Sequence, residues 1–344
     1  MISQLLLAAH PIWAAAAPLA APLPTEVSTV ESAAAESPEH GSPAAGPFTA
    51  GDPAPEDPAT EDPATEDPAT GDEVKRATAW PEFAKKAELK KSISQVRKAR
   101  TEEMAIKGAQ RLEEIGPAAA PLLLKSLKSE KDAEARARLE AALDSVTGPE
   151  HTRLLAEILD ESARPPRRYA ARRIAELGDP GLRERSEAHL AALTAEAANK
   201  RARQPVEAVD LDLAAVLCLS AGSPKGLERV ISLAAPEPWK SWSPAIEQAS
   251  AHARSAGPEI GAELSQRLSR STTPGDRVVL LRLITYAASE DQIAPVVLLL
   301  DAEQNHVKVA SINALRMIVD GEPPLKRMSS FDAIEHAKRW KARL

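Results

Sequence analysis

Apolar residues recur at helical spacing along residues 104–147, and variations of the same piece return along most of the chain. The first predicted helix has one apolar face, formed by Ala105, Ala109, Leu112 and Ile115. Gly116-Pro117 predicts the end of this helix and the start of the next, because glycine favours the position after a helix and proline the first position inside one. Two further apolar faces follow, at 122–127 and 139–146. None of these short helices can bury its apolar stripe alone, so we expect neighbouring helices to stack.

A polar turn followed by a helix with an inward apolar face recurs along the chain at a nearly constant period. The predicted starts lie at residues 106, 136, 168, 212, 245, 277 and 308, which are 30, 32, 44, 33, 32 and 31 residues apart. A period of about 30–35 residues with two helices in each unit is typical of an α-solenoid. The 44-residue interval is too long for one unit and predicts an insertion around Thr194–Val209. Aromatic residues are only 3% of the chain and strand-like runs rich in Val, Thr and Tyr are missing, which argues against a β-sandwich.

The segment 305–315, Asn-His-Val-Lys-Val-Ala-Ser-Ile-Asn-Ala-Leu, resembles the second helix of a HEAT repeat, with Lys308 where Arg is usual. Residues 132–136 and 167–171 are similar to the same pattern, whereas the units near Asp212 and Ala245 lack the basic residue. The resemblance covers roughly Trp80 to Val319. It implies an all-α fold. The architecture that it implies is a right-handed, armadillo-type α-solenoid of about seven HEAT-like helix pairs over residues 75–320. Because these motifs are degenerate, the resemblance implies an architecture and hardly any function.

Residues 1–23 form an apolar, alanine-rich segment. Its leucine-rich start resembles the apolar region of an export signal, although no Lys or Arg precedes it. His10, Pro11 and Pro18 interrupt the segment, which disfavours a membrane span. We therefore predict a signal peptide and a periplasmic or secreted protein. An uncleaved N-terminal membrane anchor and a cytoplasmic chain are the alternatives.

Residues 24–74 are predicted to be a disordered, Pro/Ala/Glu/Asp-rich linker. Glu-Asp-Pro-Ala-Thr occurs three times in tandem, at 56–60, 61–65 and 66–70, and both proline and repelling charges favour an extended chain. Residues 1–72 hold twelve acids and no Lys or Arg, so the remainder has 50 − 12 = 38 acids against 43 bases. The linker is interpreted as a spacer, with an acidic binding tail or a clamp on the basic array as the alternative.

The region 73–100 predicts a strongly basic helix with a thin apolar face. We interpret it as a solvated cap on the first repeat, since terminal repeats need a polar outer face. The alternative is a patch between Lys85 and Arg100 that binds an anionic partner such as nucleic acid, lipid headgroups or an acidic protein. Aromatic residues are not interleaved with these bases, so nucleic acid is not an expected partner.

Four residues are predicted as candidates for partner binding: Arg168, Arg172, Trp239 and Trp242. Arg168 and Arg172 are four residues apart on one helix face, where they make ion pairs between repeats or recognise a phosphate or carboxylate. Trp239 and Trp242 lie in the proline-rich stretch 236–244, which is predicted to be a loop. There they pack back onto neighbouring helices or form an exposed aromatic anchor.

The sequence contains no phosphate-binding loop, no Gly-x-Ser-x-Gly and no Cys-x-x-Cys or His-Glu-x-x-His. Asp332 and His336 are four apart, but two ligands are too few for a metal site. The single cysteine, Cys218, lies in an apolar run and is predicted to be a buried structural thiol. We therefore expect no catalytic residue, cofactor or metal, and no enzyme.

Residues 321–344 are predicted to form a C-terminal capping helix, with an inward face of Phe331, Ile334, Ala337 and Trp340. The resulting hypothesis is a non-enzymatic helical-repeat scaffold whose partner is another protein. One alternative is a HEAT-like enzyme or lyase-type subunit. The other is a salt-dependent binder of anionic surfaces through Lys85–Arg100.

Overall fold

The regular structure of the described residues is entirely helical. The computed structural model describes residues 76–199 and 205–344, and no β-strand occurs in either range. The all-α prediction is therefore confirmed for this part of the chain. The predicted export segment and acidic linker lie outside the described residues. No helix in the two ranges combines the length and the apolar character that are needed to cross a bilayer.

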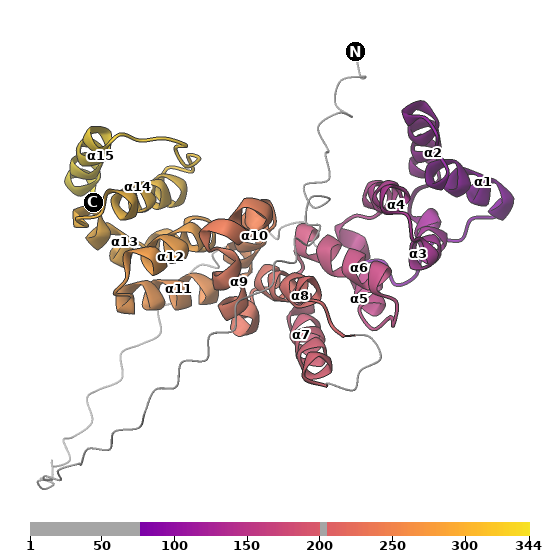
Figure 1. The fold of residues 1–344 in the computed structure, drawn as a ribbon, viewed down its shortest axis with the longest axis horizontal. Helices are drawn as coiled ribbons and strands as arrows, with labels where there is room; N and C mark the ends of the chain where they lie inside the picture. The colour runs from indigo at the N-terminus through magenta and orange to yellow at the C-terminus, as the bar shows by residue number, and fades with distance from the viewer. Residues whose placement is uncertain (1–75, 200–204) are drawn as a thin grey trace, which may run out of the picture. The chain divides into compact units, whose positions relative to one another are not determined.

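Fifteen α-helices and six short 3-10 helices follow one another in these ranges (Figure 1). The α-helices are α1 (Lys86–Arg97), α2 (Glu102–Ile115), α3 (Ala120–Ser129), α4 (Ala133–Val146), α5 (Thr152–Ile158), α6 (Arg164–Leu177), α7 (Arg183–Ala198), α8 (Ala208–Ser220), α9 (Leu227–Leu233), α10 (Pro236–Ala256), α11 (Glu259–Arg270), α12 (Pro274–Ala287), α13 (Ala294–Leu298), α14 (Asn305–Val319) and α15 (Ser330–Arg343). The 3-10 helices are η1 (Gly116–Ala119), η2 (Pro149–His151), η3 (Pro180–Leu182), η4 (Pro224–Gly226), η5 (Glu290–Gln292) and η6 (Leu299–Asp301).

Helices pack in an alternating order. Each odd-numbered helix from α1 to α13 packs against the even-numbered helix that follows it. Even-numbered helices also pack against the next even-numbered helix, from α2 to α4 and from α6 through α8, α10 and α12 to α14. Between α4 and α6, α3 makes the closer contact with α6. The described helices thus pack mainly against helices that are one or two positions away along the chain.

The seven predicted repeat starts all fall in even-numbered helices, from α2 to α14 in order. Six of them lie at the fourth or fifth residue of their helix. Side-chain caps explain why several of these helices begin where they do. The backbone N–H of Ala135 donates to Asp132 at 2.7 Å before α4, and that of Asp276 donates to Thr273 at 3.1 Å before α12.

The remaining predicted start, Ala245, lies nine residues inside α10, which begins at Pro236. The predicted loop at 236–244 is therefore wrong, because this stretch is the first part of a helix. Pro236 sits in the first turn, where a backbone N–H has no partner within the helix. Pro244 lies inside the helix, which continues past it. Both ends of the predicted insertion at Thr194–Val209 lie in helices, since α7 continues to Ala198 and α8 begins at Ala208.

The core consists mainly of Leu, Ile, Val and Ala from successive helices. Helix α8 is buried on all sides along Leu213–Ser220. Cys218 is completely buried there, and burial raises the pKa of its thiol to about 11, as expected for a structural cysteine. Gly178 ends α6 with a φ of 68°, and a Cβ there would lie 2.4 Å from the ring of His252.

The last helix, α15, packs against α14, but its inward face differs from the prediction. Ala333, Ala337 and Trp340 are buried, whereas the side chains of Phe331 and Ile334 are 72% and 44% exposed. A helix turns 100° per residue, so residues 331 and 340 of the predicted stripe lie on opposite sides. Residues 333, 337 and 340 lie within about 60° of one another and form the true inward face.

Candidate functional site

The four predicted partner-binding residues lie in two helices. Arg168 and Arg172 are on α6, and Trp239 and Trp242 are on α10. Arg172 and Trp242 are buried, with 7% and 8% of each residue exposed. Arg168 and Trp239 are half-buried. Only Arg168 and Trp239 can therefore offer a partner an accessible surface.

Arg168 joins α6 to the start of α8. Its Nε donates to Asp210 at 2.5 Å and its Nη2 donates to Glu207 at 2.8 Å. Burial acts to lower the pKa of Arg168, but the hydrogen bonds to Asp210 and Glu207 raise it overall. The guanidinium already has two carboxylate partners within the chain, so it has little capacity to bind another.

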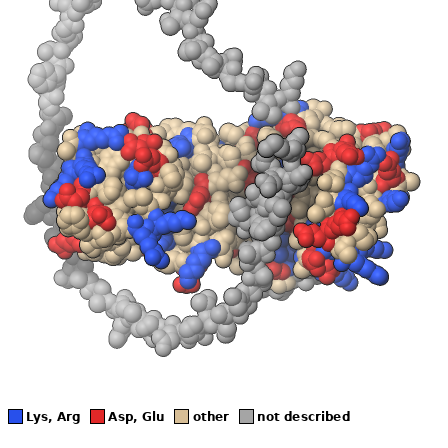
Figure 2. All heavy atoms as spheres, turned by 90° about the horizontal axis from the view of Figure 1, so that it is seen from above, with Lys and Arg blue, Asp and Glu red and all other residues tan. Residues whose placement is uncertain are grey.

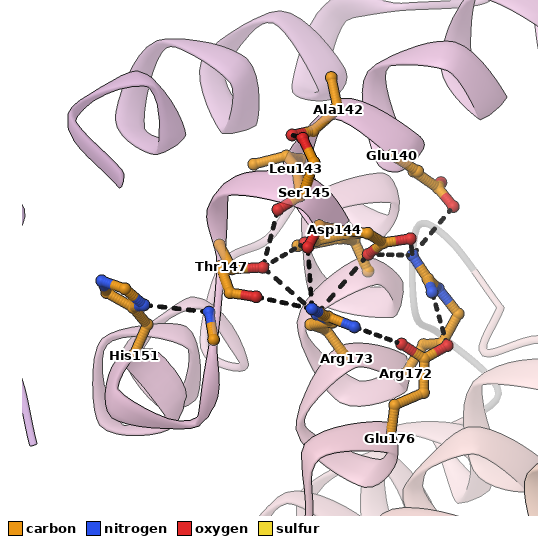
Figure 3. A network of polar contacts seen from close by, with 12 residues as sticks. Glu140, Ala142, Leu143, Asp144, Ser145, Thr147, His151, Arg172, Arg173 and Glu176 are labelled. Atoms are coloured by element: carbon orange, nitrogen blue, oxygen red, sulfur yellow. Dashed lines mark hydrogen bonds and ion pairs between the residues drawn. The ribbon is translucent and has the colours of Figure 1, made fainter. Parts of the chain in front are cut away.

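Arg172 lies in a polar network between α4 and α6 (Figure 3). Its Nη2 donates to both carboxylate oxygens of Asp144, at 3.0 and 3.1 Å, and its Nη1 donates to Glu176 at 2.6 Å. Glu140 lies 3.8 Å from the same guanidinium. Burial on its own would lower the pKa of Arg172, but the charges of Asp144 and Glu176 raise it above its ordinary value. This side chain is held by three carboxylates of its own chain.

The neighbouring Arg173 extends the network to backbone groups at the end of α4 (Figure 3). It donates to the carbonyl oxygens of Asp144 and Thr147, at 2.8 and 2.6 Å. The hydroxyl of Thr147 lies 3.1 Å from that of Tyr169. Together these contacts connect two helices whose backbones are not closely packed, which supports the interpretation of this cluster as ion pairs between repeats.

A groove of about 1030 Å³ crosses α10, α12 and α14 and is closed on one side by the segment before α15. Helices α10 and α12 contribute Trp239, Glu247, Val278, Arg282, Thr285 and Tyr286. Helix α14 contributes Asn305, His306, Val309, Ala310 and Asn313, the following segment contributes Pro324, Leu325, Lys326, Arg327, Met328 and Ser329, and α15 contributes Asp332. Apolar, aromatic and basic side chains thus meet in one depression on three consecutive even-numbered helices.

Arg282 is the central cation of this groove. Its guanidinium lies 5.5 Å from the centre of the Trp239 ring, within the range of a cation–π interaction. One of its nitrogens, Nη1, donates to the carbonyl oxygen of Ala234 at 2.7 Å. Burial lowers the pKa of Arg282, and no charged group of the described residues offsets that effect. Arg282 is thus a half-buried cation that has no carboxylate partner in the described part of the chain.

The acidic residues of the groove already have hydrogen-bond partners. Glu247 shares a hydrogen bond with Tyr286, and burial raises the pKa of both side chains. Asp332 receives the Ser329 hydroxyl at 2.7 Å in the cap of α15. Three basic residues, Arg282, Lys326 and Arg327, line the groove with these two acids, so its described lining has a small excess of positive charge.

The wall of the groove before α15 is fixed by one asparagine. The Asn313 side chain on α14 accepts from the backbone N–H of Leu325 at 2.9 Å and donates to the carbonyl of the same residue at 3.3 Å. Both backbone polar groups of Leu325 are thereby bound. This contact holds Lys326, Arg327 and Met328 beside the groove.

Sequence reasoning identified Trp239 but missed Arg282. A usable signal was present, because Arg282 is the only charged residue between Val278 and Ala287 and no acid lies three or four residues away on either side. A lone arginine in such an apolar helix cannot form an ion pair within its own helix. By contrast, Arg172 has Glu176 four residues later.

The charges on the face shown in Figure 2 do not form one basic field. Figure 2 shows a face of the molecule on which Lys and Arg alternate with Asp and Glu, separated by uncharged areas. Among the described residues, no group of three His, Cys, Asp or Glu side chains is placed to hold a metal ion. Comparisons with family models, curated proteins and solved structures found no match.

Proposed function

We propose that this chain is a non-enzymatic helical-repeat scaffold that binds another protein through the groove on α10, α12 and α14. In this proposal the seven helix pairs from α1 to α14 form a right-handed, HEAT-like α-solenoid, and α15 covers its last repeat. The period of the sequence pattern and the alternating contacts of odd and even helices support this architecture. Such arrays bind partners along a surface formed by equivalent helices of successive repeats.

Arg282 is the observation that carries the proposal. Taking a guanidinium partly out of water costs free energy unless an anion or a set of acceptors compensates for the lost hydration. Arg282 has one carbonyl and one aromatic ring for this purpose. A carboxylate from a partner would complete its hydrogen bonding, with Trp239 as an aromatic anchor beside it.

The partner that best fits the groove is a polypeptide segment with an acidic residue next to an apolar one. The carboxylate would lie at Arg282, within reach of the basic wall at Lys326 and Arg327. The apolar side chain would pack on Val309 and Met328. A central anchor of this kind, surrounded by weaker contacts, is the usual arrangement of a protein interface.

Photo-crosslinking in intact cells tests this proposal without any assumption about the compartment. A photoreactive amino acid replaces His306, which is exposed and lines the groove, and in a control chain it replaces the exposed Gln266 on α11. We expect one protein adduct from position 306 and none of that mass from position 266. Absence of an adduct at 306, or the same adduct at both positions, would contradict the proposal.

A further inference from the structure

A second groove, of about 520 Å³, lies between α1 and α3. The described charged residues that line it are all basic: Lys90 and Arg97 from α1, Lys98 directly after that helix, and Lys125 and Lys128 from α3. Its apolar floor includes Ile93, which is 5% exposed, and Leu122. The basic stretch of the sequence supplies only one side of this groove, and the fold supplies the other from residues about thirty positions later.

Two of these five cations have partners within the chain. Arg97 binds Glu130, and Lys128 lies 2.8 Å from Glu161. The other three, Lys90, Lys98 and Lys125, are exposed and form no ion pair with any described residue. Three unpaired ammonium groups around one concave surface repel one another, so an anionic ligand that bridges them would relieve the repulsion.

We propose that the groove between α1 and α3 binds an acidic polypeptide segment of a partner protein. The cations lie on both sides of an apolar floor, which suits an extended chain with carboxylates on both of its edges. Carboxylates approach the lysines from the two sides, while the backbone and small side chains of the segment cover Ile93 and Leu122.

Two other anionic partners fit this groove less well. None of the described residues that line it is aromatic, so the bases of a single-stranded nucleic acid would find no ring among them on which to stack. The large exposed apolar residues nearest in sequence, Met104 and Ile106, are on α2 and not among the lining residues. A lipid surface would therefore find charge in the groove without an apolar group to insert there.

This site is independent of the groove around Arg282, because the two share no helix and no lining residue. One alternative from the sequence was that the whole stretch Lys85–Arg100 binds anionic surfaces, but only part of this stretch lines the groove. Lys85 and Arg100 are outside the groove, whereas Lys125, which the sequence did not single out, belongs to it. Failure of one proposal leaves the other unaffected.

The test measures binding of a fluorescent decaglutamate peptide to the full chain by anisotropy. The test variant carries Lys90→Gln, Lys98→Gln and Lys125→Gln. A control variant with the same loss of charge carries Lys131→Gln, Lys240→Gln and Lys338→Gln, all exposed and outside both grooves. Equal thermal unfolding midpoints would establish that both variants are folded.

We expect the test variant to bind the peptide about tenfold more weakly than the wild type, and the control to change by less than about twofold. Raising the salt concentration should weaken wild-type binding and remove most of the difference between the variants. Equal weakening in both variants, or no binding to the wild type, would overturn the proposal. Tighter binding of a single-stranded decathymidylate or of phosphatidylserine vesicles through the same three lysines would also overturn it.

The acidic repeats of the chain itself are the remaining occupant to be tested. A further variant replaces six acids with their amides, at Glu56, Asp57, Glu61, Asp62, Glu66 and Asp67. Under the proposal, this variant binds decaglutamate as the wild type does. A tenfold gain in affinity would instead assign the groove to the chain's own acidic segment.

Discussion

Two arginines of this protein lie over aromatic rings on even-numbered helices and have different surroundings. Arg172 is 5.2 Å from the centre of the Tyr169 ring, and Arg282 is 5.5 Å from that of Trp239. Asp144, Glu176 and Glu140 surround Arg172. Arg282 has one backbone carbonyl and no carboxylate of the described residues. The same side chain thus completes the fold in one place and leaves hydrogen-bonding capacity open in the other.

The difference separates a cation that the fold itself neutralises from one that, under the proposed function, binds a partner. A buried charge is tolerated when its own chain supplies the counter-charges, and removing it leaves those counter-charges unpaired. A half-buried charge without counter-charges adds little to folding and keeps donors free for a partner. Replacing Arg172 should therefore lower the stability of the fold strongly, and replacing Arg282 should lower it only slightly. Binding of a partner should depend more on Arg282 than on Arg172.

The largest expected effect is that of Arg172→Met. This change leaves the carboxylates of Asp144 and Glu176 without their main partner between α4 and α6, which should lower the free energy of unfolding by about 3 kcal/mol. Urea denaturation at neutral pH measures the loss. A cost below about 1 kcal/mol would show that Arg173 alone maintains the network.

The next effect, Arg282→Met, should lower the free energy of unfolding by about 1 kcal/mol or less. Only one hydrogen bond and one cation–π contact are lost, and no carboxylate is left unpaired. The control is Arg277→Met on the same helix, since Arg277 likewise donates to a backbone carbonyl, that of Ser271, at 3.1 Å. A loss as large as that of Arg172→Met would make Arg282 a structural residue.

The smallest effect concerns Glu140, the third carboxylate of the network. Burial raises the pKa of Glu140, although the charge of Arg172 acts to lower it. Because the folded pKa lies above the unfolded value, ionised Glu140 opposes folding once the pH exceeds that folded pKa. Glu140→Gln should therefore stabilise the protein slightly at pH 7, and the gain should disappear as the pH falls to about 4.5. Urea denaturation at both pH values measures this, and a loss of stability at pH 7 would contradict it.

The positions of most even-numbered helices were predictable from the sequence because they depend on local spacing. A basic residue followed by apolar residues three and four positions apart marks the first turns of α4, α6, α12 and α14. The pattern weakens at α10, where three prolines suggested a loop and a helix forms instead. Burial of Trp242, Ala245 and Ile246 against neighbouring helices outweighs the local preference there.

The grooves were not predictable because each combines residues from separate units. Trp239, Arg282 and Asn313 come from three even-numbered helices, and Lys90 meets Lys125 across two odd-numbered ones. The sequence places Arg168 and Arg172 on one helix face but does not show that Asp210 on α8 and Asp144 on α4 reach them. Arg168 and Arg172 were predicted as candidates for partner binding because they belong to a prominent basic cluster, but carboxylates of their own chain balance their charges.

The most direct test of the account combines Arg282→Met with the photoreactive residue at position 306. Its matched control combines the same photoreactive residue with Arg277→Met. Loss of an interface anchor typically costs about 2 kcal/mol or more, so the partner adduct should fall at least about tenfold with Arg282→Met. The adduct should stay at the wild-type level with Arg277→Met. An unchanged adduct with Arg282→Met, in a chain shown to be folded, would contradict the claim that Arg282 binds a carboxylate of a partner.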